Sequence, residues 1–372
     1  MNVMIACGGT GGHLFPGLAV AEALAARQHK VQLLVSEKAV DQTALTSLTA
    51  FSDPSRVEVR SVSAVGYSGV RQLIRFCFRL MRATRDCAGL CDDFKPDVVL
   101  GMGGFTSAPA VLAARWRRAR TLIHESNAVP GKANRCVSRI ADHVALGMAD
   151  CARFFGNRRV TVTGTPIRSA LRQGRVADAH QRLGLERGRL TVLVMGGSQG
   201  AHAINEAMAG ALPRLEDWRD RTQFLHLTGT ADETLLSEAY EKNGMKAKVM
   251  KFCDQMELAY SAADLVVGRS GAATLAEIAA FGLPSVLIPF PRAAGDHQLH
   301  NARVFERVGA SLLIAQSQLA APRDEGGERL AEAVSALLQD EVQRQRMAAA
   351  ARSIAVTNAE ERIATLVEQY AN

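Results

Sequence analysis

The stretch GGTGGHLFPGLAVAEAL, residues 8–24, directly follows a short apolar run at residues 2–7. That run is typical of a buried parallel strand, and it ends where glycine occupies four of the next five positions. Apolar residues then recur with helical spacing, and Pro16 suits the first turn of a helix, where its missing N–H costs nothing. A second apolar run at residues 31–35 completes a strand–helix–strand unit with glycines at the strand-to-helix turn.

Strand-like runs alternate with helical patterns along the rest of the chain. In the first half the predicted strands follow at residues 57–59, 97–100, 121–123, 144–146 and 160–163. The opening pattern returns at Leu190, and further strands are predicted at residues 224–227, 248–252, 265–267, 285–288 and 312–314. This alternation predicts two doubly wound α/β domains that meet near residues 163–168. A ligand would bind in the cleft between the carboxyl ends of their strands.

Composition narrows the class of protein. The 372 residues include 44 Lys and Arg against 37 Asp and Glu, and the net charge of +7 favours phosphates, nucleotides or an anionic lipid surface as partners. The seven cysteines are dispersed, without metal-binding or paired spacing, as is usual in a reducing cytoplasm. The sequence shows neither a signal-peptide pattern nor an apolar run of eighteen residues, so any membrane contact is expected to be peripheral.

Three glycine turns share one design. They lie at residues 8–12, 101–107 and 196–201, and each follows a predicted strand and opens a predicted helix. Such a turn brings backbone N–H groups and the positive end of a helix close to a phosphate, although glycine also serves tight strand-to-helix packing. None is a dinucleotide fingerprint, since Leu14 stands where a third glycine should be, and there is no Walker-type Gly-Lys-Ser/Thr. The set favours phosphate binding over nicotinamide or ATP chemistry.

Polar residues gather where predicted strands end. The sequence HESN at residues 124–127 follows one strand, either as ligand contacts or as loop residues that bond to the backbone. Glu277 lies two turns into an apolar helix, where a buried carboxylate needs donors that two adjacent sugar hydroxyls would supply. A solvated glutamate on the helix surface is the alternative. His297 and Gln298 follow another strand end, and a glutamine there can bond to sugar hydroxyls.

The stretch VRQLIRFCFRLMR, residues 70–82, separates charged from apolar residues around a predicted helix. One narrow face carries four arginines, Arg71, Arg75, Arg79 and Arg82. The opposite arc carries Leu73, Ile74, Phe76, Cys77, Leu80 and Met81. Interfacial membrane helices combine these features, and RWRRAR at residues 115–120 would extend the patch around Trp116. Packing of the apolar face on the core is one alternative, and RNA binding is another, although no RNA-binding motif accompanies the stretch.

Seven segments together resemble the MurG family, the bacterial family 28 glycosyltransferases that add N-acetylglucosamine to undecaprenyl-pyrophosphoryl-N-acetylmuramyl-pentapeptide. In chain order they are GGTGGHLFPGLAVA, KPDVVLGMGGFTSAPAVLAA, HESNAVPGKANR, TGTPIR, VLVMGGSQGA, RSGAATLAEIAAFGLP and DHQLHNA. The resemblance spans nearly the whole chain and implies a GT-B fold of two Rossmann-like domains. It implies an acceptor-side and membrane-side domain at residues 1–164, completed by a C-terminal helix at residues 353–372. It also implies a UDP-N-acetylglucosamine domain at residues 165–352.

The resemblance further implies which residues bind the substrates. They are Thr10, Gly11, Gly12, Asn127, Arg168, Ser198, Phe252, Cys253, Ala272, Ala273, Thr274, Leu275, Ala276, Glu277 and Gln298. Among them, Phe252 and Cys253 fall where the family holds the uracil, and Glu277 looks like the ligand of the ribose. Ser126, Ala273 and Cys253 depart from the family's usual glutamine, leucine and isoleucine. Backbone contacts at the last two positions would survive this change.

The implied reaction is an inverting transfer, in which the 4-hydroxyl of the acceptor attacks the anomeric carbon of UDP-N-acetylglucosamine and UDP departs. His13 is the first candidate for the base that removes the hydroxyl proton, because imidazole titrates near neutral pH. A histidine that caps the helix or orients a pyrophosphate is the alternative reading of His13, and Glu125 is the second candidate base. Helix N-termini and Ser198 would stabilise the leaving diphosphate, so neither a cofactor nor a metal is expected.

The expected partners are UDP-N-acetylglucosamine, the lipid-linked acceptor (lipid I) and an anionic membrane surface, while nucleic acid is not expected. The expected location is the cytoplasmic face of the bacterial cell membrane, and other cell-wall synthesis proteins are further candidate partners. The predicted membrane patch consists of Leu73, Ile74, Arg75, Phe76, Arg79, Leu80 and Trp116. Three alternatives stay open: a related UDP-sugar:diacylglycerol glycosyltransferase, a UDP-sugar epimerase of the same architecture, and a catalytically silent sugar-nucleotide-binding protein.

Overall fold

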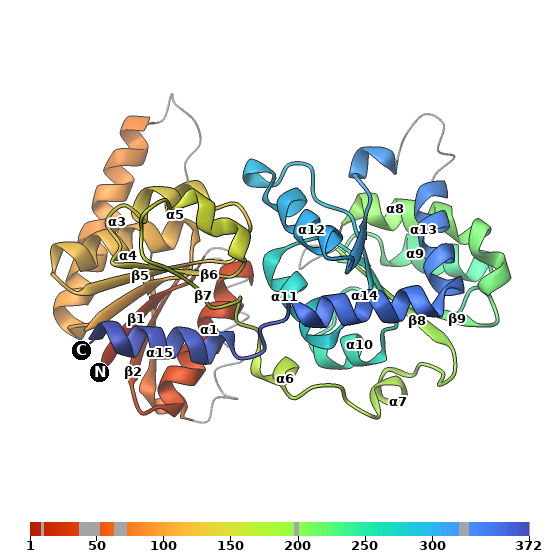
Figure 1. Ribbon diagram of the computed structural model, residues 1–372, viewed down its shortest axis with the longest axis horizontal. Coiled ribbons are helices and arrows are strands. Elements are labelled where there is room, and N and C mark those ends of the chain that lie inside the picture. The colour runs from red at the N-terminus through yellow and green to blue at the C-terminus, as the bar shows by residue number, and fades with distance from the viewer. Residues whose placement is uncertain (9–10, 37–52, 63–72, 197–200, 320–326, 372) are drawn as a thin grey trace. The chain divides into compact units, whose positions relative to one another are not determined.

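A computed structural model describes residues 1–8, 11–36, 53–62, 73–196, 201–319 and 327–371 (Figure 1). Contacts within the chain divide it into two compact units. Unit 1 consists of Met1–Ser169 and Val356–Asn372, and unit 2 consists of Ala170–Ala355. Each unit is built on one parallel sheet, so each is a doubly wound α/β structure in its own right.

The sheet of unit 1 has seven strands in the order β3-β2-β1-β4-β5-β6-β7. They are β1 (Asn2–Ala6), β2 (Lys30–Val35), β3 (Val57–Ser61), β4 (Val98–Gly101), β5 (Arg120–Glu125), β6 (His143–Leu146) and β7 (Val160–Val162). Val3 in β1 pairs with Val31 on one side and with Val98 on the other. The strand order therefore reverses between β1 and β4, which is the point where doubly wound sheets bind ligands.

Helices cover both faces of this sheet (Figure 1). On one face lie α1 (Gly11–Ala26) and α15 (Ala359–Ala371), and on the other lie α3 (Leu73–Phe94), α4 (Gly104–Trp116) and α5 (Lys132–Val137). Both faces are buried, so the central strands are apolar throughout rather than alternating: Val3, Met4 and Ile5 are fully buried.

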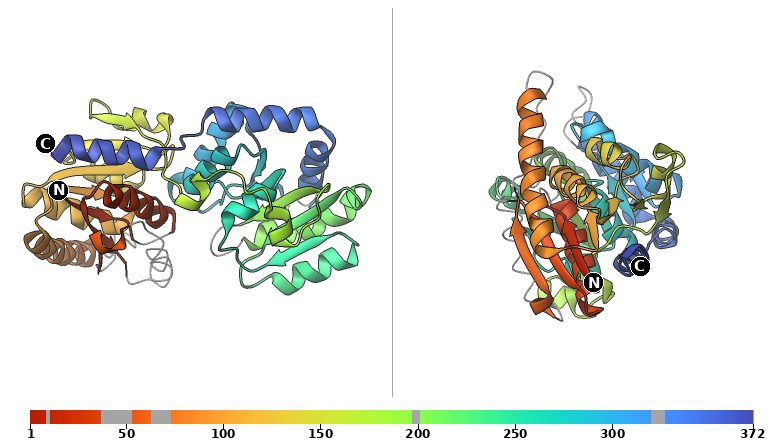
Figure 2. Two further views of the ribbon diagram at one scale, coloured as in Figure 1. Left: turned by 90° about the horizontal axis from the view of Figure 1, so that it is seen from below. Right: turned by 90° about the vertical axis from the view of Figure 1, so that its left-hand side faces the viewer.

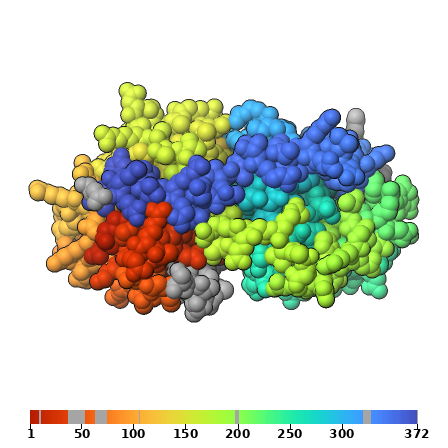
Figure 3. Space-filling model, turned by 60° about the horizontal axis from the view of Figure 1, so that its bottom comes forward, coloured from red at the N-terminus to blue at the C-terminus, as the bar shows by residue number. Residues whose placement is uncertain are grey.

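The last helix, α15, belongs to unit 1 although it lies at the far end of the chain. Its residues Ile363, Ala364 and Val367 enter the same buried cluster as the residues of α1 and β1. Arg27, directly after α1, donates hydrogen bonds to the carboxylates of Glu361 and Glu368 on α15. In the other views the blue helix again lies against the red and orange first segments (Figures 2 and 3).

The sheet of unit 2 has six strands in the order β10-β9-β8-β11-β12-β13, so it repeats the order of the first sheet. They are β8 (Leu190–Met195), β9 (Thr222–Leu227), β10 (Ala247–Met250), β11 (Leu265–Gly268), β12 (Ser285–Leu287) and β13 (Ser311–Leu313). The helices of unit 2 that bear on the site are α8 (His202–Ala211), α9 (Glu233–Lys242), α10 (Met256–Ala262), α11 (Ala272–Phe281) and α12 (His297–Arg307). Two others, α13 (Glu328–Gln339) and α14 (Glu341–Ser353), lead to the segment that returns to unit 1.

Every predicted strand is present, but two details of the sequence analysis are wrong. The described part of α1 begins at Gly11, so Pro16 lies beyond the first turn and leaves the carbonyl of Gly12 without its usual helical donor. The strand predicted at residues 248–252 ends at Met250. Met250 pairs with Leu227, the last residue of β9. Past this pair the N–H groups of Thr228 and Gly229 still donate to the carbonyls of Met250 and Lys251, but no further strand pair forms.

Candidate functional site

Two glycine turns of unit 1 meet where β1 and β4 lie side by side. Gly103 and Gly104 have positive φ angles of 101° and 74°, which favour glycine. A Cβ atom at Gly103 would lie 2.9 Å from Cε1 of His13, and one at Gly104 would lie 3.1 Å from its Cδ2. The imidazole of His13 on α1 therefore lies directly against the backbone that opens α4.

Hydrogen bonds fix the two turns to each other. The hydroxyl of Thr106 in the first turn of α4 donates to the carbonyl of Gly8 at 2.8 Å. The hydroxyl of Ser107 accepts from the N–H of Gly103 at 2.9 Å and reaches the carbonyl of Ala6 at 3.0 Å. The amino ends of α1 and α4 thus converge on one corner, an arrangement that favours an anion.

The glycines of the first turn serve different purposes. A Cβ atom at Gly8 would lie 2.2 Å from the backbone N of Ser36, so Gly8 is required by the close approach of the chain after β1 to the chain after β2. A Cβ atom at Gly11 would meet only the ring of Phe15, at 3.3 Å, and Gly12 is exposed. Tight packing therefore explains Gly8, whereas Gly11 and Gly12 leave the backbone accessible to a ligand.

Glu125 holds the loop that follows β5. Its buried carboxylate accepts four hydrogen bonds of 2.9–3.0 Å: two from Asn127, one from the N–H of Gly131 and one from Nδ2 of Asn134. Asn134 also lies next to Gly103, since a Cβ atom there would be 3.5 Å from its Nδ2. The structure thereby brings His13, Glu125 and Asn127 into one cluster. Sequence reasoning missed Asn134, although it stands in the HESNAVPGKANR segment.

His124 connects this loop to the segment that leaves unit 1. Its Nε2 donates to the carbonyl of Gly164 at 2.9 Å, and its Nδ1 lies 3.3 Å from the hydroxyl of Ser126. A carbonyl only accepts, so the proton of the neutral ring is on Nε2. The ring is fully buried, and this burial lowers the pKa of His124. His124 is therefore an uncharged structural histidine.

Arg168 lies beside the first turns of α1. Its guanidinium stacks on the ring of Phe15 at 5.0 Å from the centroid, within reach of a cation–π interaction. Phe15 is also the ring that faces Gly11. The guanidinium consequently contributes positive charge to the corner formed by the two glycine turns. Phe15 was missed by sequence reasoning, because its role depends on a residue far along the chain.

The predicted donor residues of unit 2 gather around the start of α11. The helix begins at Ala272 after Gly271, whose extended backbone (φ −64°, ψ 141°) makes it the N-cap. Ala272 and Leu275 are buried, whereas Ala273, Thr274, Ala276 and Glu277 are half-buried on the same two turns. Glu277 accepts a hydrogen bond of 2.8 Å from the hydroxyl of Tyr260 on α10. Tyr260 has no motif of its own, so sequence reasoning missed it.

Gln298 forms hydrogen bonds to the segments that follow β11 and β12. Its Oε1 accepts from the N–H of Phe290, after β12, at 2.9 Å, and its backbone carbonyl accepts from the hydroxyl of Ser270, after β11, at 2.7 Å. Near the end of β10, Phe252 is 53% exposed whereas Cys253 is buried, so an aromatic ring is available for stacking. Thr10 and Ser198, two other predicted substrate contacts, lie outside the described residues.

A polar network lies under the start of α8. Asp232 accepts from Nδ1 of His202 at 3.0 Å and from Nδ2 of Asn205 at 2.7 Å, and Oδ1 of Asn205 meets Nε2 of His226 at 3.1 Å. The hydroxyl of Tyr240 completes the chain at 3.0 Å from Nδ1 of His226. Burial lowers the pKa of His226 to about 3, so this ring is neutral. The network anchors α8 to the end of β9.

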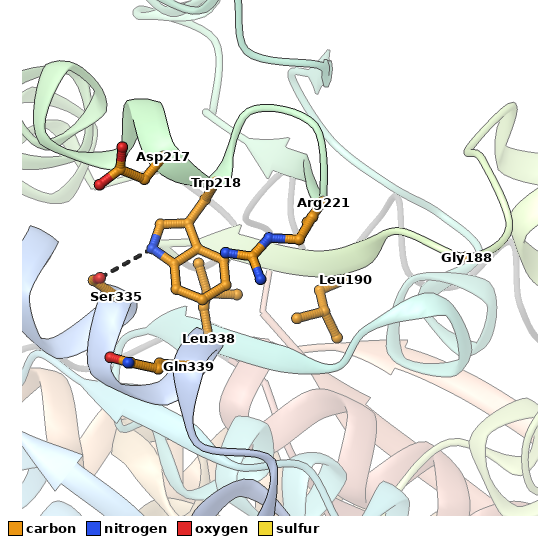
Figure 4. Close-up of a pocket in the computed structure, with 8 residues that line it drawn as sticks. All are labelled: Gly188, Leu190, Asp217, Trp218, Arg221, Ser335, Leu338 and Gln339. Atoms are coloured by element: carbon orange, nitrogen blue, oxygen red, sulfur yellow. Dashed lines mark hydrogen bonds between the residues drawn. The ribbon is translucent and has the colours of Figure 1, made fainter.

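A cavity of about 530 Å³ lies elsewhere in unit 2 (Figure 4). Leu190, the first residue of β8, lines it, so it is at the amino end of the sheet and not at the carboxyl ends that carry the predicted donor residues. Trp218 in its wall donates to the hydroxyl of Ser335 at 3.0 Å and is covered by Arg221. Among the described residues, no three His, Cys, Asp or Glu side chains gather closely enough to hold a metal ion.

The chain is similar to known proteins over nearly its whole length. Residues 3–146 match the glycosyltransferase family 28 N-terminal domain, and residues 191–366 match the family 28 C-terminal domain. A UDP-N-acetylglucosamine--N-acetylmuramyl-(pentapeptide) pyrophosphoryl-undecaprenol N-acetylglucosamine transferase from Syntrophotalea carbinolica is 38% identical over 366 residues, covering 98% of this chain and 97% of that protein. The protein of the same name from Geobacter metallireducens is 36% identical and covers 95% of this chain and 94% of its own length.

Solved structures agree with these matches. The crystal structure of Acinetobacter baumannii MurG has a TM-score of 0.76 and 28% identity, and the match covers 99% of both chains. A UDP-GlcNAc 2-epimerase from Neisseria meningitidis reaches a TM-score of 0.70 at 12% identity, a likeness of fold alone. Together with the two parallel sheets, these matches confirm the predicted GT-B class of two doubly wound domains.

The neutral His124 predicts an acid-sensitive fold. Below about pH 6.5 a histidine in the unfolded chain gains a proton, whereas the buried ring of His124 stays neutral because burial lowers its pKa. The unfolded state therefore binds more protons, and the free energy of unfolding falls as pH falls. His124→Gln keeps an N–H donor for Gly164 but does not titrate. In urea titrations at pH 7.5 and 5.5 it should reduce this loss, by up to about 1.4 kcal/mol per pH unit.

The slope that remains in His124→Gln belongs to other groups, such as His143 and His226, whose pKa values are also lowered by burial. An unchanged slope in the variant would show that His124 is protonated in the native state.

Proposed function

Because the chain belongs to the MurG family of glycosyltransferase family 28, we propose that it transfers N-acetylglucosamine from UDP-N-acetylglucosamine to undecaprenyl-pyrophosphoryl-N-acetylmuramyl-pentapeptide. It is a UDP-N-acetylglucosamine-dependent hexosyltransferase of peptidoglycan synthesis, which converts lipid I to lipid II. The observation that carries the proposal is the match over 98% of the chain to a relative of this name. The anion-favouring corner of unit 1 and the carboxylate at the start of α11 supply the chemistry that this reaction needs.

The donor residues of unit 2 suit a uridine nucleotide. The exposed ring of Phe252 offers a stacking surface to a base, and Glu277 offers a carboxylate to a ribose. The positive end of the α11 dipole points toward the same end of the sheet, where it favours a diphosphate. Gln298, tied to two strand ends, is placed to contact sugar hydroxyls through its amide nitrogen.

The corner of unit 1 suits the reacting end of the acceptor. Two helix N-termini and the Arg168 guanidinium favour an anionic pyrophosphate there, and His13 lies at the same corner. In the transfer, the acceptor 4-hydroxyl forms a bond to the anomeric carbon while the bond from that carbon to the UDP oxygen breaks. His13 accepts the hydroxyl proton, and UDP leaves with the electron pair of the broken bond.

Glu125 fits a supporting role better than that of the base. Its carboxylate already accepts four hydrogen bonds from its own loop, and a proton acceptor in the reaction would have to break some of them. We therefore assign Glu125 to positioning, with Asn127 as the side chain that it aims toward the substrates. His13 remains the proposed base.

Membrane docking through unit 1 is part of the proposal. Unit 1 contains 23 Lys and Arg against 15 Asp and Glu, whereas unit 2 contains 21 against 22, so the positive charge of the chain resides in unit 1. None of the helices in the described ranges is long and apolar enough to span a bilayer. The proposed contact with the cytoplasmic face of the membrane is peripheral and rests on the charge of unit 1.

The docking surface follows the exposed start of α3. This end of the helix projects beyond the rest of unit 1 in two views (Figures 1 and 2). Its most exposed apolar side chains are Ile74, Phe78 and Met81, at 74%, 66% and 65%, whereas the predicted patch members Phe76 and Leu80 are half-buried. Trp116 at the end of the neighbouring α4 is 65% exposed. Such a surface is favourable for an anionic lipid interface.

The transfer assay tests the proposed reaction directly. Purified protein is offered UDP-N-acetylglucosamine or UDP-galactose with either the lipid-linked muramyl acceptor or diacylglycerol. We expect product only from UDP-N-acetylglucosamine and the muramyl acceptor. Transfer only to diacylglycerol, or an epimerised sugar nucleotide without acceptor, would replace the proposal by one of those activities.

The variant His13→Ala tests the base. Loss of a positioned general base reduces turnover by about 100-fold or more, while affinity for UDP should stay within about two-fold, because His13 acts on the acceptor proton. The measurements are kcat and UDP titration calorimetry. His29→Ala is the control, since His29 pairs with Glu368 at the amino end of β2 and should keep full turnover. Unimpaired turnover in His13→Ala would remove His13 from the mechanism.

The triple variant Ile74→Ser, Phe78→Ser and Met81→Ser tests docking. Removing this exposed apolar area should weaken binding to phosphatidylglycerol vesicles by at least about ten-fold in sedimentation assays. Transfer to a water-soluble acceptor analogue should not change. Leu235→Ser with Val342→Ser, which removes exposed apolar side chains of unit 2, is the matched control. Equal vesicle binding by all three proteins would contradict docking through α3.

A further inference from the structure

Tyr260 is a tyrosine whose hydroxyl bonds to a predicted substrate contact, Glu277. It is fully buried on α10, and its hydroxyl donates to Oε2 of Glu277 at 2.8 Å. A carboxylate offers about four acceptor positions, so a bond from Tyr260 is compatible with further bonds from a ligand. A bond from a neutral donor to a carboxylate is stronger than one between neutral groups.

The ring of Tyr260 has little freedom to move. Residues Met256 and Leu258 to Ala262 of α10 are all buried, and the ring of Tyr260 packs on Phe281 with 5.4 Å between centroids. Its hydroxyl also lies 3.8 Å from the sulfur of Met195, the last residue of β8. The phenol thus extends from the packed interior to the carboxyl end of the sheet and arrives there in a fixed position.

Glu277 depends on such a partner for its orientation. It is a half-buried residue on a helix whose neighbours Leu275 and Ile278 are buried, and a flexible glutamate loses side-chain entropy when a ligand immobilises it. A hydrogen bond that already holds one oxygen reduces that cost before the ligand arrives. The carboxylate is then aligned in the free protein.

We propose that Tyr260 is a positioning residue for the nucleotide donor, which acts by aligning the Glu277 carboxylate for the two hydroxyls of the ribose. The inference rests on the proposed function, since that function assigns the ribose to Glu277. Tyr260 does not touch the nucleotide itself. Its contribution is therefore confined to ligands that carry ribose hydroxyls, and it affects the donor KM rather than kcat.

The variant Tyr260→Phe tests this by removing the hydroxyl alone. Titration calorimetry compares UDP with 2′,3′-dideoxyuridine diphosphate, which lacks both ribose hydroxyls. We expect the variant to bind UDP about five-fold more weakly than wild type, as for the loss of one hydrogen bond, and to bind the dideoxy ligand as wild type does. In turnover assays the KM for UDP-N-acetylglucosamine should rise by a similar factor with kcat within about two-fold.

Tyr370→Phe is the matched control, because it also removes a tyrosine hydroxyl that makes a 2.8 Å bond, in that case to Nδ1 of His143 on unit 1. It should leave the affinity for both ligands unchanged. In the background Glu277→Ala, the change Tyr260→Phe should no longer affect UDP binding. This comparison also detects a fold defect, which would weaken binding in either background.

Two results would overturn the inference: unchanged UDP affinity in Tyr260→Phe, or an equal loss for UDP and the dideoxy ligand, as a general distortion would cause. Failure of the proposed function looks different. If wild type transfers no sugar to the muramyl acceptor but its UDP affinity depends on Tyr260 as expected, the positioning role stands and only the acceptor is wrong.

Discussion

The close approach of backbone segments where β1, β2 and β4 end is the constraint on which the rest of unit 1 depends. Gly8 permits the chain after β1 to lie against Ser36, and Thr106 then reaches the carbonyl of Gly8. This places the starts of α1 and α4 in one corner. A side chain at Gly103 would overlap His13 and one at Gly104 would crowd it, so the imidazole occupies space that the two glycines leave open. The sterics of these few positions thereby determine where the imidazole of His13 lies relative to the amino ends of α1 and α4.

The candidate site of unit 2 is organised differently: its polar side chains are held by hydrogen bonds from neighbouring side-chain and backbone groups. Glu277 is held by Tyr260, and Gln298 is held by the N–H of Phe290. The network around Asp232 holds the start of α8 in the same manner. Preorganisation of this kind reduces the ordering that a nucleotide must cause when it binds. In the proposed function, the two units separate the tasks of admitting a phosphate and orienting a sugar nucleotide.

The strands of both sheets could be predicted from sequence, because strands buried on both faces are continuous apolar runs that end in glycine or polar residues. Where helix α1 begins could not be predicted from its periodicity, and Pro16 was consequently placed one turn too early. The end of β10 was also missed, since it depends on how far regular pairing with the distant β9 continues. Pattern along the chain predicts elements, whereas their limits depend on neighbours that are distant in sequence.

Residues of the candidate site could be predicted where they stand in a sequence motif. Residues that matter through a contact with another side chain could not. His13, Glu125 and Asn127 stand in recognisable segments, and the structure brings them together. Three residues were missed because each matters through one contact with another side chain. These contacts join Asn134 to Glu125, Phe15 to Arg168, and Tyr260 to Glu277. The tight fit of Gly8 against Ser36 likewise gives no local signal. A sequence shows which residue types are present, but a contact between distant residues appears only in the folded chain.

The packing of α15 on α1 has a consequence for how the protein is made. The apolar face of α1 that Ile363 and Val367 cover is synthesised long before those two residues. While the chain is still being elongated, this apolar face of unit 1 is uncovered. At that time all the residues of unit 2 have already been synthesised, so unit 2 can form its hydrophobic core. Domains usually finish folding in the order of synthesis. Here unit 2 can close first, because unit 1 is complete only after the residues of α15 have been synthesised.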